Sequence, residues 1–280
     1  MPDIVIHGIA SAMYVGLAWH FWNTRWRTAE AKRGLRAWER VAILAPLALH
    51  GWLIYRGIFA APELRFGFAQ ALSVMMFLGV ILYWIESLFF SLVGMQPLVL
   101  GGAALCVLLP YWFPGRSMPG PVSSDFKIHL ALALVAYSVF TIALLHAVLM
   151  AVADRLLHRR KLTESAGAHP LAGPVASLPP LLTIEQMFFR LVAVAFVLLT
   201  LTLGSGMTLS ESMFGKAMRF NHETVFAVAS WLTFAVLLWG RVFRGWRGRT
   251  ALRWTIAGFV MVVLANIGTA FVLEVLLHRA

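Results

Sequence analysis

Ser123-Ser124-Asp125-Phe126-Lys127-Ile128-His129 opens an apolar run that continues to about Met150. About 20 residues at ~1.5 Å each cross the ~30 Å hydrocarbon core of a bilayer, so this run predicts a membrane-spanning helix. Ser124 is a candidate N-cap, and Asp125 is expected near the positive end of the helix dipole. His129 is then expected one turn inside the helix, where lipid head groups give way to hydrocarbon.

Composition places the rest of the chain in the membrane as well. The 280 residues are 60% hydrophobic and 12% charged, with a mean hydropathy of +0.80. The net charge of +11 would suggest a nucleic-acid partner in a soluble protein. Here the basic residues lie in short loops between apolar runs, and membrane topology explains them without nucleic acid. The single cysteine, Cys106, excludes a disulfide within the chain, a CxxC thiol pair and a CxxCH haem-attachment site.

Hydropathy and charge together predict the topology. The apolar segments are expected at about 4–22, 40–59, 66–90, 96–113, 126–152, 186–207, 222–240 and 252–278. Of the 23 lysines and arginines, 16 fall on one side of these segments and 7 on the other. The richer side is expected to be cytoplasmic, which puts both termini in the periplasm. The sequence therefore predicts one all-α membrane domain over 1–280, an eight-helix bundle crossing a bacterial inner membrane.

The connections between segments carry start and stop signals. Residues 110–125 are rich in proline and glycine and predict a periplasmic loop without helical continuity. Thr183-Ile184-Glu185-Gln186 matches a capping box and predicts the start of the sixth helix. Asn221 is a candidate N-cap for the seventh helix. Residues 208–221 are expected to form the second periplasmic loop.

Several histidines are predicted to share one depth. By this topology His129, His222 and His278 all fall at the outer membrane boundary, together with His7. Glu274 precedes His278 by four residues, so a helix would present both on one face, and the carboxylate could hold the second ring nitrogen. The alternatives are histidines that hydrogen-bond water or a loop carbonyl, and a Glu274 that pairs with Arg279 or a loop amide.

Two ionisable residues are predicted inside the bilayer. His50 is about nine residues into the second segment, near the bilayer middle, where an ionisable group suggests a functional site. A neutral imidazole that donates to a backbone carbonyl is the alternative. Glu86, near the inner end of the third segment, is expected to pair with a cationic side chain.

Four stretches carry a resemblance to a known family. They are His129 to Tyr137-Ser138, Pro180-Leu181-Leu182-Thr183-Ile184-Glu185, Thr200-Leu201-Thr202-Leu203-Gly204-Ser205-Gly206 and Gly245-Trp246-Arg247-Gly248-Arg249. The pattern resembles the CcsA-type cytochrome c assembly family of haem-handling membrane proteins, and within it the short YpjD-like branch. The resemblance is strongest over 126–278.

This resemblance implies a cofactor and a set of ligands. The family is thought to hold haem at the outer face through an external histidine pair, which His129 and His278 match. His222, Glu274 and His50 are further candidate haem-binding residues, and the cofactor would be haem b. A second cytochrome c assembly subunit or an apocytochrome is the implied partner, beside membrane lipid.

The chain departs from the family pattern at two places. Residues 208–221 contain no tryptophan, whereas the family has a tryptophan-rich loop there. Trp239 and Gly240 stand where the family usually has a histidine near the inner end of the seventh helix. Trp239 is therefore expected to mark a lost intramembrane ligand, which leaves the outer boundary as the predicted haem site.

These residues suggest three possible functions. Binding and handling of haem is the leading hypothesis, and no catalytic constellation is identified that would make the chain an enzyme. A transporter or channel without haem is the alternative, with His50, Glu86 and Glu274 as the candidate intramembrane charges. A two-haem electron-transfer subunit would need two helices that each present two histidines on one face. It is disfavoured, because the helix turns by a net angle of about 220° between His7 and His20 and about 260° between His129 and His146, so neither pair shares a face.

Overall fold

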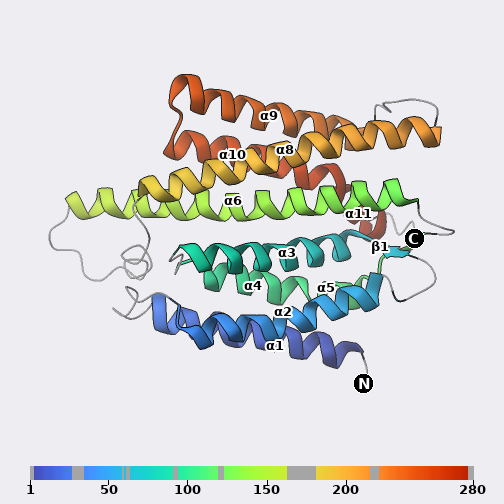
Figure 1. Ribbon diagram of the computed structural model, residues 1–280, viewed down its shortest axis with the longest axis horizontal. Helices are drawn as coiled ribbons and strands as arrows, with labels where there is room; N and C mark the ends of the chain where they lie inside the picture. Colours follow the sequence, from blue (N-terminus) through green and yellow to red (C-terminus); the bar gives the residue numbers. More distant parts are fainter. Residues whose placement is uncertain are drawn as a thin grey trace.

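The computed structural model describes residues 3–26, 35–58, 60, 64–90, 94–118, 123–162, 181–214 and 221–276. Over these residues the chain is almost entirely helical, which confirms the predicted all-α, polytopic class (Figure 1). Helices are the expected solution in lipid, because they satisfy their backbone hydrogen bonds without water.

The helices pack as two groups that share α3. The first group joins α1 (Asp3–Phe21), which continues as the π-helical turn η1 (Trp22–Trp26), to α2 (Ala37–Ile58), α3 (Phe68–Phe89), α4 (Gln96–Cys106) and α5 (Leu109–Trp112). The second group joins α6 (Ser124–Leu162), α8 (Leu181–Phe214), α9 (His222–Arg244) and α10 (Gly248–Val263). Contacts between α3 and α6 connect the two groups.

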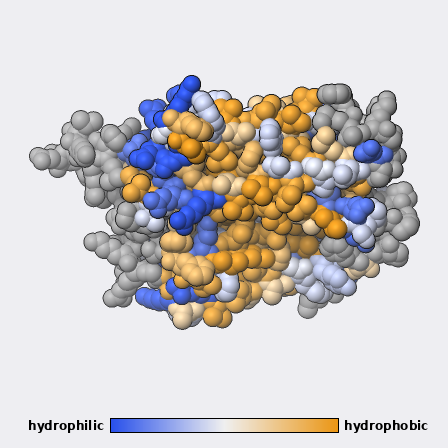
Figure 2. Space-filling model, turned by 45° about the horizontal axis from the view of Figure 1, so that its top comes forward, coloured by the Kyte–Doolittle hydropathy of each residue, from blue (hydrophilic) through white to orange (hydrophobic). Residues whose placement is uncertain are grey.

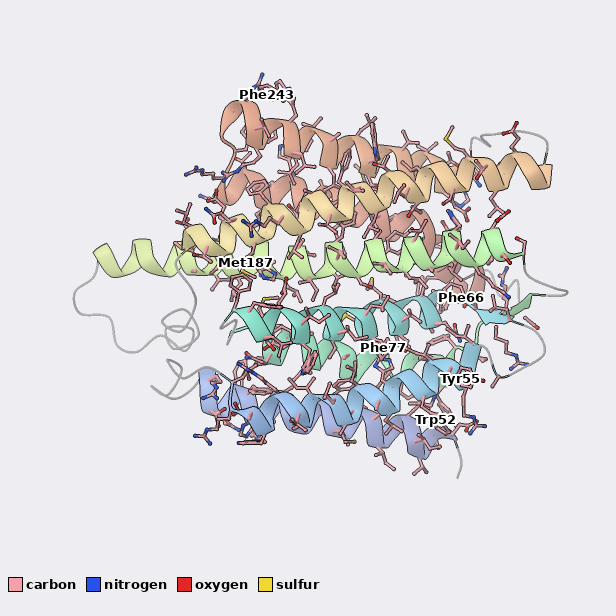
Figure 3. The ribbon with its side chains drawn as sticks, in the orientation of Figure 1. Trp52, Tyr55, Phe66, Phe77, Met187 and Phe243 are labelled. Atoms are coloured by element: carbon pink, nitrogen blue, oxygen red, sulfur yellow. The ribbon has the colours of Figure 1, made fainter. Side chains whose placement is uncertain are left out.

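The helices lie roughly antiparallel, so α1 begins and the last described helix ends at the same end of the bundle (Figure 1). On the face that Figure 2 shows, hydrophobic residues cover the middle of the bundle, and hydrophilic residues gather beyond them, most densely at the left end. Trp52, Tyr55 and Phe66 lie toward the right end, which the charge bias assigns to the periplasm (Figure 3). We call the two ends inner and outer accordingly.

Six of the eight predicted spans are helices long and apolar enough to cross a membrane among the described residues. They are Asp3–Arg25, Ala37–Ile58, Phe68–Phe89, Ser124–Arg155, Leu181–Glu211 and His222–Arg244. The fourth predicted span is a shorter apolar helical stretch, Gln96–Trp112, which breaks between α4 and α5. The eighth is interrupted by π-helical turns, as α10, η3 (Leu264–Gly268), α11 (Thr269–Phe271) and η4 (Val272–Leu276). A count of eight spans is therefore not established.

A small sheet lies at the outer end, where only a loop was predicted. Strand β1 (Leu64–Phe66) pairs antiparallel with β2 (Arg116–Met118), and Arg65 lies opposite Ser117. Three-residue strands carry too little periodicity to be recognised in a sequence. The pairing fixes the segment before α3 to the segment before α6.

Three predicted helix ends differ from the structure. Ser123, and not Ser124, caps α6, since its Oγ accepts a hydrogen bond from the backbone N of Phe126 at 3.2 Å. The capping role of Thr183 is wrong, because α8 already begins at Leu181. The predicted loop 208–221 is helical as far as Phe214, and its residues 215–220 lie outside the described residues. The cap at Asn221 is confirmed, with its side chain accepting from the Thr224 backbone N at 2.9 Å.

A buried ion pair holds the inner ends of α1 and α2 together. The side chains of Arg25 and Glu39 are each 1% exposed, and the Arg25 guanidinium donates to Glu39 Oε2 at 2.8 Å. The same carboxylate accepts from the Arg36 backbone N at 2.7 Å and contacts His20 Nε2 at 3.0 Å. A charge in such a place is tolerated only because several partners surround it.

The Glu39→Ala substitution is expected to leave the Arg25 guanidinium buried without its carboxylate. Breaking a buried pair in this way costs about 3–5 kcal/mol, whereas the Asp125→Ala change of an exposed helix-terminal charge should cost under ~1 kcal/mol. Reversible denaturant unfolding in detergent micelles would measure both. Equal stability of the two variants would show that the buried pair does not hold the two helices.

The topology is tested by a reporter fused after Ala280. Because the basic residues concentrate at the opposite end, a reporter that works only in the periplasm is expected to be active in whole cells. The matched control is a fusion within residues 163–180, in the connection assigned to the cytoplasm, which should be inactive. The reverse pattern would overturn the assignment of inner and outer ends.

Candidate functional site

His129 lies at the outer end of α6, facing α8. Its Nδ1 is 2.9 Å from the Oγ of Ser205. The Ser205 hydroxyl donates its own proton to the Thr202 carbonyl at 3.1 Å, so it accepts from His129. Nδ1 therefore carries the ring proton, and Nε2 keeps its lone pair for a ligand.

Gly206 provides the room for this imidazole. A Cβ at position 206 would lie 3.1 Å from the His129 Cε1, which is tighter than ordinary van der Waals contact. Ser205 and Gly206 are neighbours on α8. One turn of this helix therefore orients the His129 imidazole through Ser205 and leaves space for it at Gly206.

A cavity of about 260 Å³ opens beside His129. It lies among the outer ends of α3, α6 and α9 and the π-helical turns that follow α10. Its wall is mainly apolar and includes Phe66, Phe68, Phe126, Leu130, Leu134 and Ile267. Its polar members include His129, Tyr137, Arg116, Glu223 and Glu274. An apolar wall with a few polar groups is typical of small-molecule sites.

Glu274 connects the last described helical turn to α3. Its carboxylate accepts a hydrogen bond from the backbone of Phe68, the first residue of α3. The approach is close, because a Cβ on Gly67 would lie 2.5 Å from Glu274 Oε1. The positive end of the α3 dipole favours a carboxylate there. Glu274 itself lies in the π-helical turn η4, and such turns are frequent at functional sites.

The structure brings some predicted site residues together and leaves others apart. His129 and Glu274 line the same cavity. His222 is the exposed first residue of α9 and precedes the cavity residue Glu223. His278 lies outside the described residues, so its distance from His129 stays a prediction.

His50 is in the first helix group and does not line this cavity. Its ring is fully buried, with Nε2 at 2.9 Å from the Ser73 Oγ and Nδ1 at 3.3 Å from the Tyr14 hydroxyl. Both ring nitrogens thus face hydroxyl groups of neighbouring helices, and the backbone carbonyl weighed as the alternative is not the partner.

Two further intramembrane positions are placed at the inner end. Glu86 Oε2 lies 3.6 Å from Nε2 of the buried His146, so the neighbour of Glu86 is a histidine and not the permanently cationic side chain that was expected. Trp239, which was predicted to mark a lost ligand, is 47% exposed and lies under the guanidinium of Arg244 at 5.0 Å. Position 239 therefore points away from the core.

Sequence reasoning missed Ser205, Arg116 and Glu223 as members of the site. Ser205 lies inside the Thr200–Gly206 stretch that carried the resemblance, and its position between two glycines was the available signal. Arg116 lies on β2, directly before α6, and the β1–β2 pairing holds it at the cavity. Glu223 comes from α9, distant in the chain, and only tertiary packing brings it to the cavity beside His129.

Comparison with known proteins gives one matching family. A family model described as Cytochrome C assembly protein matches residues 38–277. The inner membrane protein YpjD of Escherichia coli K12 is 32% identical over 181 residues. The cytochrome c biogenesis protein CcsA of Prochlorococcus marinus is 26% identical over 178 residues. These matches cover 64% and 59% of this chain.

The curated relatives are matched over only part of their length. An uncharacterised 28.8 kDa protein of Azospirillum brasilense is 29% identical and matches 61% of this chain. The aligned region covers 64% of YpjD, 58% of the Prochlorococcus CcsA and 65% of the Azospirillum protein. No solved structure matches the chain.

The Ser205→Ala substitution is expected to remove the acceptor that holds the His129 proton on Nδ1. Losing such a hydrogen bond costs about 1 kcal/mol and lets the ring change tautomer. Nitrogen NMR of the ¹⁵N-histidine-labelled protein would detect this, with the His129 signal assigned from its absence in His129→Gln. Thr208→Ala, one turn further along α8 and exposed, is the matched control. An unchanged His129 signal in Ser205→Ala would contradict the assigned tautomer.

Proposed function

Because this chain belongs to the cytochrome c assembly protein family, we propose that it binds and handles haem during cytochrome c biogenesis. It would do so as a multi-pass protein of the bacterial inner membrane, the location that the name of its relative YpjD gives. The haem would be held without a covalent link, as haem b, since the chain has no CxxCH motif.

One observation supports the haem assignment above the others. The Ser205 hydroxyl holds the proton of His129 on Nδ1, which leaves the Nε2 lone pair available. Haem would supply an iron that accepts a neutral imidazole as axial ligand. A ring already held in the ligating tautomer loses little conformational freedom when it binds a metal.

The walls of the cavity also fit a porphyrin. Phe66, Phe68 and Phe126 present apolar surface to a flat macrocycle. Arg116 offers a cation of the kind that recognises carboxylates such as the haem propionates. The cavity of about 260 Å³ is below the ~300–1,000 Å³ that encloses a drug-sized ligand, so it would hold one edge of the macrocycle.

We propose His278 as a second haem ligand. Glu274 lines the cavity, and His278 follows it by four residues in the sequence. His222 is the reserve ligand, since its neighbour Glu223 lines the same cavity. His50 has both nitrogens near hydroxyls and would contribute to haem binding only by rearranging. An apocytochrome or another assembly subunit would meet the haem at the open side.

A second candidate function is transport or conduction without haem. The Glu86–His146 pair favours it, because the two side chains lie 3.6 Å apart between α3 and α6, and ionisable pairs in membrane helices often line ion or proton paths. A protein of this kind would show no haem absorption after purification from haem-replete cells.

The haem proposal predicts an absorption spectrum that depends on His129. Detergent-purified protein should show a Soret band and sharpen its α-band on reduction with dithionite. His129→Ala and His278→Ala should each lower the haem bound per protein, and the double variant should abolish it, because each removes one iron ligand.

His158→Gln is the matched control, since it changes a histidine near the inner end of the same helix, α6. It should retain the wild-type spectrum. Haem that survives the double substitution but is lost in His50→Ala would place the cofactor in the first helix group and contradict the outer site. Absence of haem from every preparation would leave the transport function as the better explanation.

A further inference from the structure

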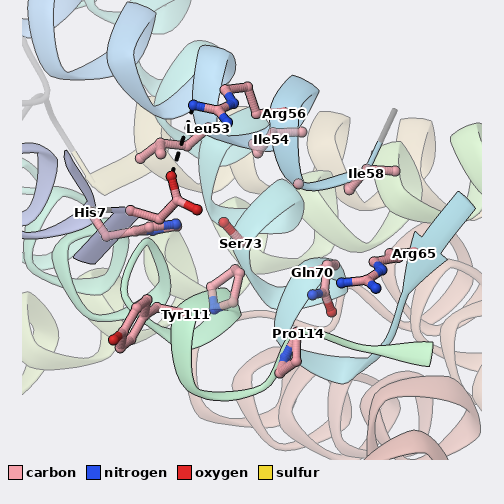
Figure 4. A pocket seen from close by; sticks show the side chains of 13 residues that line it. His7, Leu53, Ile54, Arg56, Ile58, Arg65, Gln70, Ser73, Tyr111 and Pro114 are labelled. Carbon is pink, nitrogen blue, oxygen red and sulfur yellow. Dashed lines mark ion pairs between the residues drawn. The ribbon is translucent and has the colours of Figure 1, made fainter. Parts of the chain in front are cut away.

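A second cavity lies at the outer end of the first helix group. It has a volume of about 360 Å³ and opens among the outer ends of α1, α2, α3 and α5 (Figure 4). None of its lining residues belongs to the cavity beside His129. Whatever it binds is therefore separate from the haem proposed above.

The charges on this cavity favour an anion. Arg56 and Arg65 line it together with a single carboxylate, that of Asp3. The guanidinium of Arg56 lies 3.8 Å from the Asp3 Oδ1 and 5.1 Å from the centre of the Trp52 ring. Among the described residues the guanidinium of Arg65 has no hydrogen-bond or ion-pair partner. Arg65 thus remains to bind an acidic group of a ligand. The planar guanidinium matches the geometry of both phosphate and carboxylate.

Two residues that line the cavity also carry unused hydrogen-bond acceptors. Gln70 is 3% exposed, and its Nε2 donates to the Phe113 carbonyl at 3.1 Å while its Oε1 has no partner. His7 donates from Nδ1 to the Val107 carbonyl at 2.6 Å, which leaves its Nε2 as an acceptor. A buried oxygen without a donor is costly, so the occupant is expected to carry hydroxyl groups as well as an anion.

The surroundings place this cavity beside the lipid. Ile4 and Val5 on α1 are 44% and 43% exposed, and Tyr111 at the cavity edge is 42% exposed. Trp52 and Tyr55 lie at the same end of the bundle, where aromatic residues meet the head groups (Figure 3). An occupant can therefore extend apolar chains along α1 while its polar part enters the cavity.

We propose that this cavity binds the head group of an anionic phospholipid whose phosphate is esterified to a hydroxylated alcohol, as in phosphatidylglycerol. The phosphate would lie against Arg65 and Arg56, and the glycerol hydroxyls would donate to Gln70 Oε1 and His7 Nε2. The acyl chains would cover the exposed apolar side of α1. Basic pockets between membrane helices bind lipid head groups by the same chemistry.

The proposal is tested by lipid retention in native mass spectrometry. Protein purified in detergent is mixed with equal amounts of phosphatidylglycerol and phosphatidylcholine, and bound lipid is counted per molecule. Wild-type protein should retain phosphatidylglycerol preferentially. Arg65→Gln removes a charge-assisted contact with the phosphate and should weaken binding by about tenfold or more. Gln70→Glu should weaken it too, because a carboxylate would face the phosphate.

Lys127→Gln is the control, because it removes an exposed cation from the same outer end without touching the cavity. Thermal unfolding of each variant separates loss of binding from loss of folding, and Arg65 is exposed enough to be replaced safely. Equal retention of the two lipids, or equal binding by wild type and Arg65→Gln, would overturn the proposal. Competition by soluble glycerol phosphate at the same concentration as the lipid would assign the site to a free phosphate ester instead.

Discussion

The hydrogen bond between His129 and Ser205 is the interaction on which the proposed site depends. It joins α6 to α8, the two helices that make the most extensive contact among the described elements. Because both helices are long and rigid, their packing sets the direction of the imidazole, and Gly206 leaves the space that the ring needs. Ser205 also decides which ring nitrogen carries the proton. The packing of α6 against α8 therefore determines that Nε2 is the nitrogen left to bind a ligand.

The bilayer explains why polar groups gather at the two ends. At the inner end a buried carboxylate, Glu39, is surrounded by Arg25, His20 and the Arg36 backbone, and it serves to hold helices together. At the outer end the polar side chains instead border two cavities with mainly apolar walls. At the inner end several partners surround the Glu39 carboxylate, whereas at the outer end the Gln70 Oε1 has no hydrogen-bond partner and the His129 Nε2 keeps its lone pair.

The sequence was sufficient for the class of fold and the depth of single residues. Long apolar runs predict helices because lipid permits little else, and the charge bias assigns His129 and Glu274 to one end of the bundle. It was insufficient where tertiary contacts decide. Glu274 was assigned either to His278 or to Arg279 or a loop amide. Its carboxylate accepts from the backbone of Phe68 at the start of α3, a contact that no spacing within its own helix reveals. The β1–β2 pairing likewise depends on a partner strand distant in the chain.

The central claim is that the His129 imidazole ligates haem iron from a cavity at the outer end of α6. Ligand rescue tests it most directly: His129→Gly leaves a space in which free imidazole can take the place of the side chain. The account predicts that the variant purifies with an altered haem spectrum, and that added imidazole restores the low-spin wild-type spectrum in a saturable titration. A haem-bound His129→Gly protein with the wild-type spectrum and no response to imidazole would contradict it.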